Sequence, residues 1–346
     1  DSLKDAPPPP VPPVPPSDPL SIDLNANGTV DTLSINAGIH FDLDNNGFAE
    51  RTSWVAPTDG MLVLDRNSNN KIDGGAELFG TETKLIDGSF AENGFIALAE
   101  FDLNKDGKID SQDAVFTQLR VWKDINSNGV TDAGELQALA ATNIASLNVT
   151  YTSNTTTDAN NVQHREAGTF VRSSGGTGIT NTLWFESDKQ ATIPIEELNG
   201  DGIALTMEIK ALPNAKGFGY VYSLHQAMAL DSSGQLQQKV QSFVNETDIT
   251  VRKTLVNDIL ILWAGQQNTT SNSRGENIDA KQLGVLEKFW GQEAQQANPT
   301  LRYAQELNTV YQQLSNSIYT QMASYQQADV LSMVEFSNVG GSLTAN

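Results

Sequence analysis

The sequence contains no cysteine. Disulfide bridges, thiolate zinc sites and cysteine nucleophiles are therefore excluded. Basic residues are scarce as well, because 21 Lys and Arg stand against 42 Asp and Glu, which gives a net charge of −21. A surface this acidic argues against nucleic acid and anionic membranes as partners, and it favours the uptake of cations.

Long apolar runs are also missing. The longest run, residues 259–264, has the length of a core segment and is too short to span a membrane. The N-terminus has no basic segment followed by an apolar one, so no signal peptide is recognisable. We therefore expect no membrane span. Because the sequence starts without Met, we also expect a piece of a larger exported protein.

Composition predicts four segments. Residues 1–18 are rich in proline and predict a polyproline II linker. Residues 19–190 are dense in Asp, Asn and Gly, residues 191–219 form a connector, and residues 220–346 show helical periodicity. The predicted fold class is α+β. It consists of a calcium-loop-rich module with EF-hand-like loops and a small antiparallel sheet, followed by an all-α domain.

Apolar periodicity predicts the individual elements. In the acidic segment it predicts a helix, a short helix or strand, and three strands, at residues 91–101, 116–122, 145–151, 163–171 and 181–186. Turns are expected at 153–161 and 173–178. The second half predicts helices at residues 221–230, 234–244, 250–264, 280–291 and 300–327. We expect His164 to be a surface or cross-strand residue and His225 to be structural.

Asp18-Pro19 is the one Asp-Pro dipeptide in the chain. The proline nitrogen carries no hydrogen, so the usual succinimide route is closed. The Asp18 carboxylate can still attack its own backbone carbonyl, which would form a cyclic anhydride and expel the proline nitrogen. Such tethered reactions reach effective molarities on the order of 10⁵ M or more. The dipeptide is therefore a candidate self-cleavage site, and the alternative is that it merely ends the linker.

An acidic pattern recurs from residue 19 to about residue 136. The EF-hand calcium loop places oxygen ligands at positions 1, 3, 5, 7, 9 and 12, with glycine at position 6. Two stretches, which begin at Asp102 and Asp124, fill every position. A third stretch begins at Asp65 and has its closing Glu77 one residue late, so it must bulge or rely more on Asp73.

Two further stretches are half-loops. The loop at residues 23–31 has Ser34, and the loop at residues 42–50 has Ser53, where the closing acid belongs. These half-loops could bind calcium with the help of a distant acid, or they could be plain turns. Five such stretches in one segment are hard to assign to chance, so we predict Ca²⁺ as the cofactor.

The candidate ligands follow the loop template, with position 7 contributing a backbone carbonyl. In chain order they are Asp23, Asn25, Asn27, Asp31, Asp42, Asp44, Asn46, Glu50, Asp65, Asn67, Asn69, Lys71, Asp73, Glu77, Asp102, Asn104, Asp106, Lys108, Asp110, Asp113, Asp124, Asn126, Asn128, Val130, Asp132 and Glu135.

Five stretches carry a resemblance to a known family. They read PLSIDLNANGTVDTL, FDLDNNGFAERTSWV, GMLVLDRNSNNKIDGGAELFG, NGFIALAEFDLNKDGKID and LRVWKDINSNGVTDAGEL. In order and spacing they resemble the self-processing module of FrpC-type RTX (repeat-in-toxin) proteins, from Asp18-Pro19 to about residue 190. Residues 220–346 resemble, more loosely, the helical region that follows such modules.

The resemblance implies that calcium folds the module and triggers cleavage of the Asp18-Pro19 bond. It implies that Asp18 is both nucleophile and acyl donor, so a lysine of another chain could accept the aspartyl group as an isopeptide. Lys4, Lys84 and Lys189 are candidate acceptors. It also implies a secreted or bacterial cell-surface protein. This chain departs from the pattern by carrying Asn in place of Asp at several ligand positions, which removes charge and weakens calcium binding. These positions are Asn25, Asn27, Asn67, Asn69 and Asn104.

Two other functions stay open. The chain could be a calcium-stiffened structural or adhesin segment without processing. A hydrolase acting on other proteins has little support, because the sequence contains neither HExxH nor GxSxG and no cysteine. The self-processing module would act once and would not be a turnover enzyme.

Overall fold

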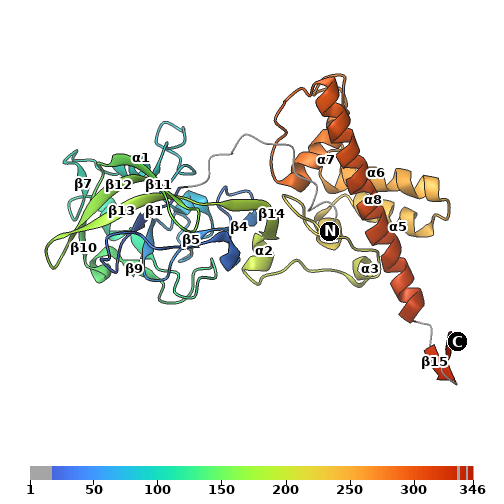
Figure 1. The fold of residues 1–346 in the computed structure, drawn as a ribbon, viewed down its shortest axis with the longest axis horizontal. Coiled ribbons are helices and arrows are strands. Elements are labelled where there is room, and N and C mark those ends of the chain that lie inside the picture. Colours follow the sequence, from blue (N-terminus) through green and yellow to red (C-terminus); the bar gives the residue numbers. More distant parts are fainter. Residues whose placement is uncertain (1–17, 333–335, 340–341, 346) are drawn as a thin grey trace. The chain divides into compact units, whose positions relative to one another are not determined.

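The computed structural model describes residues 18–332, 336–339 and 342–345. The predicted linker lies outside the described residues up to position 17, and so does Lys4. Residue contacts group the chain into two compact units that divide between Asp201 and Gly202. Figure 1 labels many of the elements of both units. The segment boundaries predicted at residues 18, 190 and 219 remain predictions.

The first unit is built on an antiparallel sheet of nine strands. The strand order is β7-β10-β12-β13-β1-β6-β8-β9, and β11 pairs with β12. The strands are β1 (Leu20–Ile22), β6 (Gly60–Val63), β7 (Lys108–Ile109), β8 (Arg120–Trp122), β9 (Leu136–Ala138), β10 (Ile144–Asn148), β11 (Thr152–Thr157), β12 (Gln163–Arg172) and β13 (Thr177–Trp184). Strand β1 pairs with β13 and with β6, so Asp18-Pro19 leads directly into the middle of the sheet.

Smaller elements complete this unit. A three-stranded sheet has the order β14-β4-β3, and β2 pairs with β5. These strands are β2 (Thr32–Leu33), β3 (Ile39–Phe41), β4 (Phe48–Thr52), β5 (Trp54–Val55) and β14 (Ser187–Pro194). The short helical segments are η1 (Ile35–Ala37), η2 (Gly75–Glu77), α1 (Gly94–Ala99), η3 (Ala114–Thr117), η4 (Leu139–Thr142) and α2 (Ile195–Leu198).

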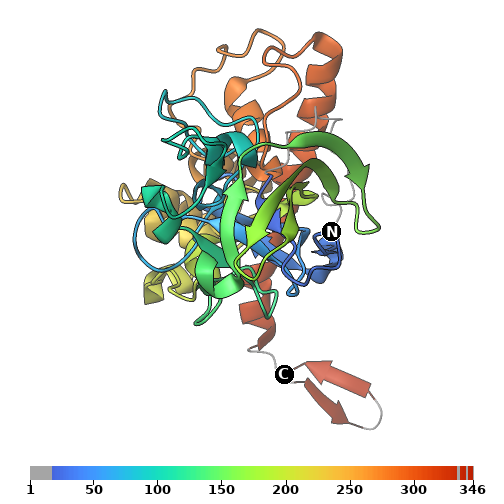
Figure 2. The ribbon, with the colours of Figure 1, turned by 90° about the vertical axis from the view of Figure 1, so that its left-hand side faces the viewer.

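The large sheet separates two hydrophobic cores. Side chains alternate between the faces of a strand. On β6 and just beyond it, Leu62 and Leu64 therefore join one core together with Leu20, while Met61 and Val63 join the other. Aromatic rings with centroids 5.2–5.6 Å apart fill the second core, namely Phe41, Trp54, Trp122 and Phe185. Figure 2 shows the long strands of this unit, in green, curving strongly.

The prediction of a small sheet was wrong in extent. The predicted strands at 145–151, 163–171 and 181–186 correspond to β10, β12 and β13. The predicted turn at 153–161 contains β11, the turn at 173–178 contains the start of β13, and β14 was not predicted. Strands β1, β6 and β9 were also not predicted, because three or four residues are too few to show an alternation.

The predicted helix at 91–101 is shorter than expected. Helix α1 begins after Asn93, whose side chain accepts hydrogen bonds from the N–H groups of Phe95 and Ile96. An Asn cap of this kind satisfies N–H groups that have no partner inside the helix. The segment predicted as a helix or strand at 116–122 contains the end of η3 and the whole of β8.

The second unit is mainly helical, as predicted. Its helices are α3 (Met207–Lys210), α4 (Leu224–Leu230), α5 (Gln235–Asn245), α6 (Ile249–Trp263), α7 (Ala280–Trp290) and α8 (Leu301–Ser332). The all-α prediction was wrong at its end, because β15 (Phe336–Val339) pairs with β16 (Ser342–Ala345). His225 has a structural role, since its Nε2 lies 2.8 Å from the Leu212 carbonyl oxygen. Among the described helices, none has the length and apolar character needed to cross a membrane.

Candidate functional site

Asp18 is fully buried immediately before β1. Its carboxylate accepts two backbone hydrogen bonds, one from the Thr81 N–H to Oδ1 at 2.6 Å and one from the Gly94 N–H to Oδ2 at 3.3 Å. Both donors are far from Asp18 in the sequence, so the fold itself fixes the orientation of this carboxylate.

The backbone around the Asp18-Pro19 bond is held from two sides. The Leu20 N–H donates to the Phe79 carbonyl at 2.8 Å, and the Leu183 N–H donates to the Pro19 carbonyl at 3.1 Å. Gly80 lies directly against the Asp18 carbonyl. A Cβ atom on Gly80 would be 2.5 Å from the Asp18 carbonyl oxygen and 3.0 Å from its carbon. A side chain at position 80 would therefore collide with the bond in question.

The surroundings of Asp18 favour its protonated form. Burial, with a smaller contribution from the charge of Glu166, raises the pKa of Asp18 to about 7. The hydrogen bonds from Thr81 and Gly94 oppose the increase because they stabilise the carboxylate. The group is therefore poised between its acid and carboxylate forms near neutral pH.

The five acidic stretches share one local backbone. The residue at position 4 has positive φ in each, namely Ala26, Asn45, Ser68, Lys105 and Ser127. The residue at position 6 also has positive φ in each, namely Gly28, Gly47, Asn70, Gly107 and Gly129. In all five, the position-6 N–H donates to the position-1 Asp at 2.8–3.0 Å. The half-loops are therefore built like the complete ones.

Two of the loops are closed by a glutamate in the same way. Glu135 accepts the N–H groups of Ile125 and Asp132 at 2.9 and 3.0 Å. Glu77 accepts those of Arg66 and Asp73 at 3.0 and 2.8 Å. The late position of Glu77 in the sequence therefore does not prevent it from making the same bonds as Glu135.

The loop at residues 23–31 is closed by an acid that the sequence pattern did not reveal. Asp59 accepts the N–H groups of Leu24 and Asn25 at 3.0 and 3.3 Å, and that of Asp31 at 2.7 Å. It thus takes the place that a glutamate takes in the loops above. Asp59 lies in a turn outside the loop template, so spacing alone gave no signal for it.

Asp59→Asn is expected to lower the free energy of unfolding by about 1–3 kcal/mol, because the new amide group would face an N–H donor in a buried position. Urea denaturation at a fixed, saturating calcium concentration measures this change, and calcium titration measures the accompanying loss of affinity. Asp87→Asn is the control, since the Asp87 carboxylate accepts only local bonds from Ser89 among those described. An unchanged free energy and affinity in Asp59→Asn would contradict the role of this residue.

The loop at residues 42–50 gathers three carboxylates. Ligand atoms of Asp42, Asp44 and Glu50 lie within 4.8 Å of one another. Glu50 is 1% exposed, its Oε2 accepts the Leu43 N–H at 3.1 Å, and its Oε1 has no hydrogen-bond partner. Burial, followed by the charge of Asp44, raises the pKa of Glu50 to about 9. A buried acceptor oxygen without a donor, in an all-oxygen cluster, fits a hard cation such as Ca²⁺.

Two residues from outside this loop lie beside it. Lys189 of β14 places its Nζ 2.9 Å from Asp44 Oδ2, with its side chain 19% exposed. Burial and the charges of Asp44 and Asp42 raise the pKa of Glu82. Ser53, which stands where the closing acid belongs, lies between β4 and β5, and its hydroxyl accepts the Glu186 N–H at 2.9 Å.

The loop that begins at Asp102 is the more exposed of the complete ones. Asp113 Oδ2 accepts the Asp110 N–H at 3.0 Å. This Asp therefore closes its loop with one described hydrogen bond, whereas Glu77 and Glu135 each close theirs with two. The Lys108 ammonium lies 2.6 Å from Asp110 and 3.7 Å from Asp106. A calcium ion here would compete with this ammonium for the two carboxylates.

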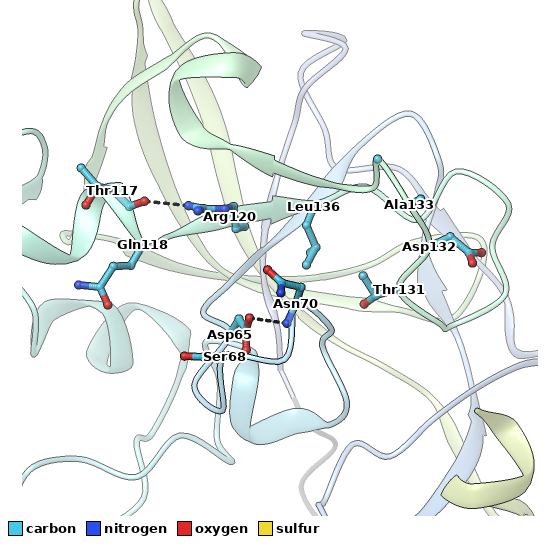
Figure 3. Close-up of a pocket in the computed structure, with 11 residues that line it drawn as sticks. Asp65, Ser68, Asn70, Thr117, Gln118, Arg120, Thr131, Asp132, Ala133 and Leu136 are labelled. Carbon is cyan, nitrogen blue, oxygen red and sulfur yellow. Dashed lines mark hydrogen bonds between the residues drawn. The ribbon is translucent and has the colours of Figure 1, made fainter. Parts of the chain in front are cut away.

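The loops that begin at Asp65 and Asp124 are neighbours. The Ile72 N–H of the first donates to Thr131 Oγ1 of the second at 3.0 Å. Next to this bond is a pocket of about 540 Å³, which Figure 3 shows with Asp65, Ser68 and Asn70 from one loop and Thr131, Asp132 and Ala133 from the other. The two loops are therefore in direct contact.

The predicted ligands thus form five separate loops and not one common site. Asn25, Asn67 and Asn126 each donate from the side-chain amide to the position-9 Asp of the same loop, at 2.7–3.2 Å. The position-7 carbonyls of Lys71, Lys108 and Val130 remain predicted ligands. Sequence reasoning missed the groups around Asp18, namely Gly80, Thr81, Gly94 and Glu166.

Two comparisons relate the chain to known proteins. Residues 20–186 match the SPM domain family. A 249-residue stretch, 71% of the chain, is 36% identical to the iron-regulated protein FrpA of Neisseria meningitidis serogroup C. The aligned stretch covers only 22% of the length of that protein. These matches support a relationship of the chain to proteins of the FrpA and FrpC type.

Proposed function

We propose that residues 18–186 form a calcium-triggered module that cleaves its own Asp18-Pro19 bond once, through an aspartyl anhydride. The observation that carries this proposal is the position of Asp18. It is fully buried, two backbone N–H groups hold its carboxylate, and Gly80 lies against the carbonyl of the bond to be broken. A residue that merely ended a linker would need none of these contacts.

The reaction uses the Asp18 side chain as the nucleophile. One carboxylate oxygen forms a bond to the Asp18 carbonyl carbon, the bond from that carbon to the Pro19 nitrogen breaks, and the nitrogen takes up a proton. Water then opens the anhydride and leaves Asp18 as a new C-terminus. Holding the carboxylate in one orientation supplies the proximity on which such a reaction depends.

Calcium provides the trigger in this proposal. The five loops contribute mostly Asp and Asn oxygens, which are the ligands that a hard cation takes. Clustered carboxylates repel one another without an ion, so metal binding adds to the free energy of folding. Four of the five loops adjoin or contain strands of the sheet that contains β1. The loop at 23–31 follows β1, the loop at 65–77 follows β6, the loop at 102–113 contains β7, and the loop at 124–135 joins β8 to β9. Ordering these loops would therefore order the sheet that positions Asp18.

The relationship to FrpA-type proteins supports this function and a secreted location. RTX proteins are exported, and a module that waits for calcium would stay inactive in the cytosol and react outside the cell. The SPM domain match begins at residue 20, next to the bond in question. We infer that this chain is a segment of a secreted or surface-exposed RTX protein.

A lysine amine could replace water as the acceptor of the aspartyl group. Lys84 is exposed, and its Nζ lies 5.8 Å from the centroid of the Phe90 ring. Lys189 is held beside Asp44. Of these two, Lys84 on a second copy of the chain is the better candidate for an isopeptide bond, because its amine is more accessible.

The alternative function is a calcium-stiffened structural segment without processing. It is favoured by the shared backbone of the five loops, which does not involve Asp18. Incubation of the chain in EDTA and then in a few millimolar calcium separates the two functions. Self-processing predicts loss of residues 1–18, a new N-terminal Pro19, and cross-linked adducts lighter by one water in the intact mass. A chain that gains structure yet keeps its mass for a day leaves only the structural function.

The rate of cleavage is expected to depend on pH through Asp18. The nucleophile is the carboxylate, and the pKa of Asp18 is raised to about 7. The rate should therefore rise about tenfold per pH unit below this value and level off above it. Cleavage followed on gels from pH 5 to 9, at saturating calcium, measures the profile. A rate that is already constant from pH 5 upward would contradict the raised pKa.

A further inference from the structure

The segment from the end of β6 to the start of α1 holds the chain around Asp18 at several points. In its first half, the Phe79 carbonyl accepts the Leu20 N–H at 2.8 Å. Close by, the Thr81 N–H donates to Asp18 Oδ1 at 2.6 Å. At the start of α1, the Gly94 N–H donates to Asp18 Oδ2 at 3.3 Å. The position of the Asp18 carboxylate therefore depends on how this segment is held in place.

Thr83 lies within this segment and is buried, with 2% of its surface exposed. Its hydroxyl donates to the Leu78 carbonyl at 2.9 Å and accepts the Gly80 N–H at 3.2 Å. Its backbone N–H also donates to the Gly80 carbonyl at 3.0 Å. Thr83 therefore closes a tight turn over residues 78–83, and this turn contains Thr81.

Thr83 also joins this turn to the rest of the unit. Its carbonyl accepts the Ala91 N–H at 2.9 Å, which links the turn to the chain that leads into α1. Leu78, which accepts the Thr83 hydroxyl, forms a β-bridge with Val63 at the end of β6. Strand β6 pairs with β1, which begins two residues after Asp18. The contacts of Thr83 therefore connect the groups that hold Asp18 to the central sheet.

The backbone around these groups is closely packed. A Cβ atom on Gly94 would be 2.4 Å from the Phe79 carbonyl oxygen and 2.8 Å from Leu20 Cβ. The start of α1, the turn and the start of β1 are therefore in direct contact. A shift of the turn would move the Thr81 N–H relative to the carboxylate of Asp18.

We propose, on the premise of the proposed function, that Thr83 is a positioning residue for cleavage of the Asp18-Pro19 bond. Its described hydrogen bonds do not reach Asp18, so it acts through the turn. The hydroxyl fixes the turn that presents the Thr81 N–H to the attacking carboxylate and Gly80 to the carbonyl under attack. A hydroxyl suits this role because it donates to one backbone group and accepts from another.

The test compares Thr83→Val with the wild-type chain at saturating calcium, by intact mass over time. Valine has nearly the shape of threonine but leaves the Gly80 N–H and the Leu78 carbonyl without the hydroxyl. A displacement of about 1 Å can cost about 100-fold in rate, so we expect cleavage about 10–100-fold slower per folded chain. Trp fluorescence gives the folded fraction. Thr83→Ser keeps the hydroxyl and should restore most of the wild-type rate.

The pH profile separates positioning from stability. The hydrogen bonds from Thr81 lower the pKa of Asp18, whereas burial and the charge of Glu166 on β12 raise it. If Thr83→Val loosens the Thr81 bond, the carboxylate loses stabilisation and its pKa rises. The rate should then level off about half a pH unit or more above the wild-type value. A purely structural Thr83 would change the folded fraction and leave this pH where it is.

Thr52→Val is the matched control. Thr52 is fully buried in β4, and its hydroxyl donates to the Ser53 carbonyl at 2.9 Å. Strand β4 belongs to the three-stranded sheet, which does not contain β1. This variant therefore loses a buried hydroxyl without altering the turn at Thr83. It should cleave at the wild-type rate per folded chain, with the wild-type pH profile.

Two results with Thr83→Val overturn the inference and leave the proposed function in place. One is cleavage at the wild-type rate per folded chain, and the other is slow cleavage with an unchanged pH profile. If Thr83→Val does not fold, Thr83→Ala removes the same hydroxyl with a smaller side chain, and the same results decide. A wild-type chain that does not cleave at all overturns the proposed function itself, and this inference with it.

Discussion

Replacing Asp18 by Asn is expected to abolish cleavage in calcium, with a rate more than about 10³-fold below that of the wild type. The neutral amide is a far weaker nucleophile than a carboxylate. It also has a single oxygen to accept the N–H groups of Thr81 and Gly94, which both donate to Asp18 in the wild type. Intact mass and N-terminal analysis after a day in calcium measure the result.

The controls separate chemistry from folding. Asp18→Asn should gain structure in calcium like the wild type, because the loops do not include residue 18. Asp201→Asn, at an exposed site near the end of the first unit, should cleave normally. Loss of residues 1–18 from Asp18→Asn at the wild-type rate would exclude Asp18 as the nucleophile.

Gly80→Ala is expected to slow cleavage at least about 100-fold, because a displacement of about 1 Å at a reacting group can cost that factor. The added Cβ would lie 2.5 Å from the Asp18 carbonyl oxygen and 3.0 Å from its carbon, closer than real contacts allow. The backbone of Asp18 must therefore move away from residue 80. Cleavage in calcium gives the rate, and calcium-induced Trp fluorescence shows whether the variant folds.

The matched control is Gly88→Ala in the same segment. Gly88 has φ of +87°, and its added Cβ would meet nothing within 4 Å. An alanine there costs about 1–2 kcal/mol of backbone strain without reaching Asp18. If Gly88→Ala cleaves normally while Gly80→Ala does not, the loss is local to the bond. A Gly80→Ala chain that folds and cleaves at the wild-type rate would show that contact with the carbonyl does not matter.

The acidic loops could be predicted from the sequence because their determinants are local. The position-1 aspartate and the N–H group that it accepts lie within a few residues of each other, as between Asp124 and Gly129. Short-range Asp and Asn hydrogen bonds and positive φ at fixed positions need no tertiary contact to be recognisable. The candidate bond Asp18-Pro19 was likewise evident, because its chemistry belongs to two adjacent residues. The helices of the second unit were evident from periodicity over many turns.

Other features were decided only by the tertiary structure. Asp59 closes the loop of Asp23 from outside the template, and Glu77 closes its own loop despite its late position. The short strands beside β1 carried too little alternation to be seen. The groups that make Asp18 more than the end of a linker, namely Gly80, Thr81, Gly94 and Glu166, come from separate loops and strands. They meet Asp18 because β1 pairs in the middle of the sheet, and spacing along a single chain does not reveal such long-range pairing.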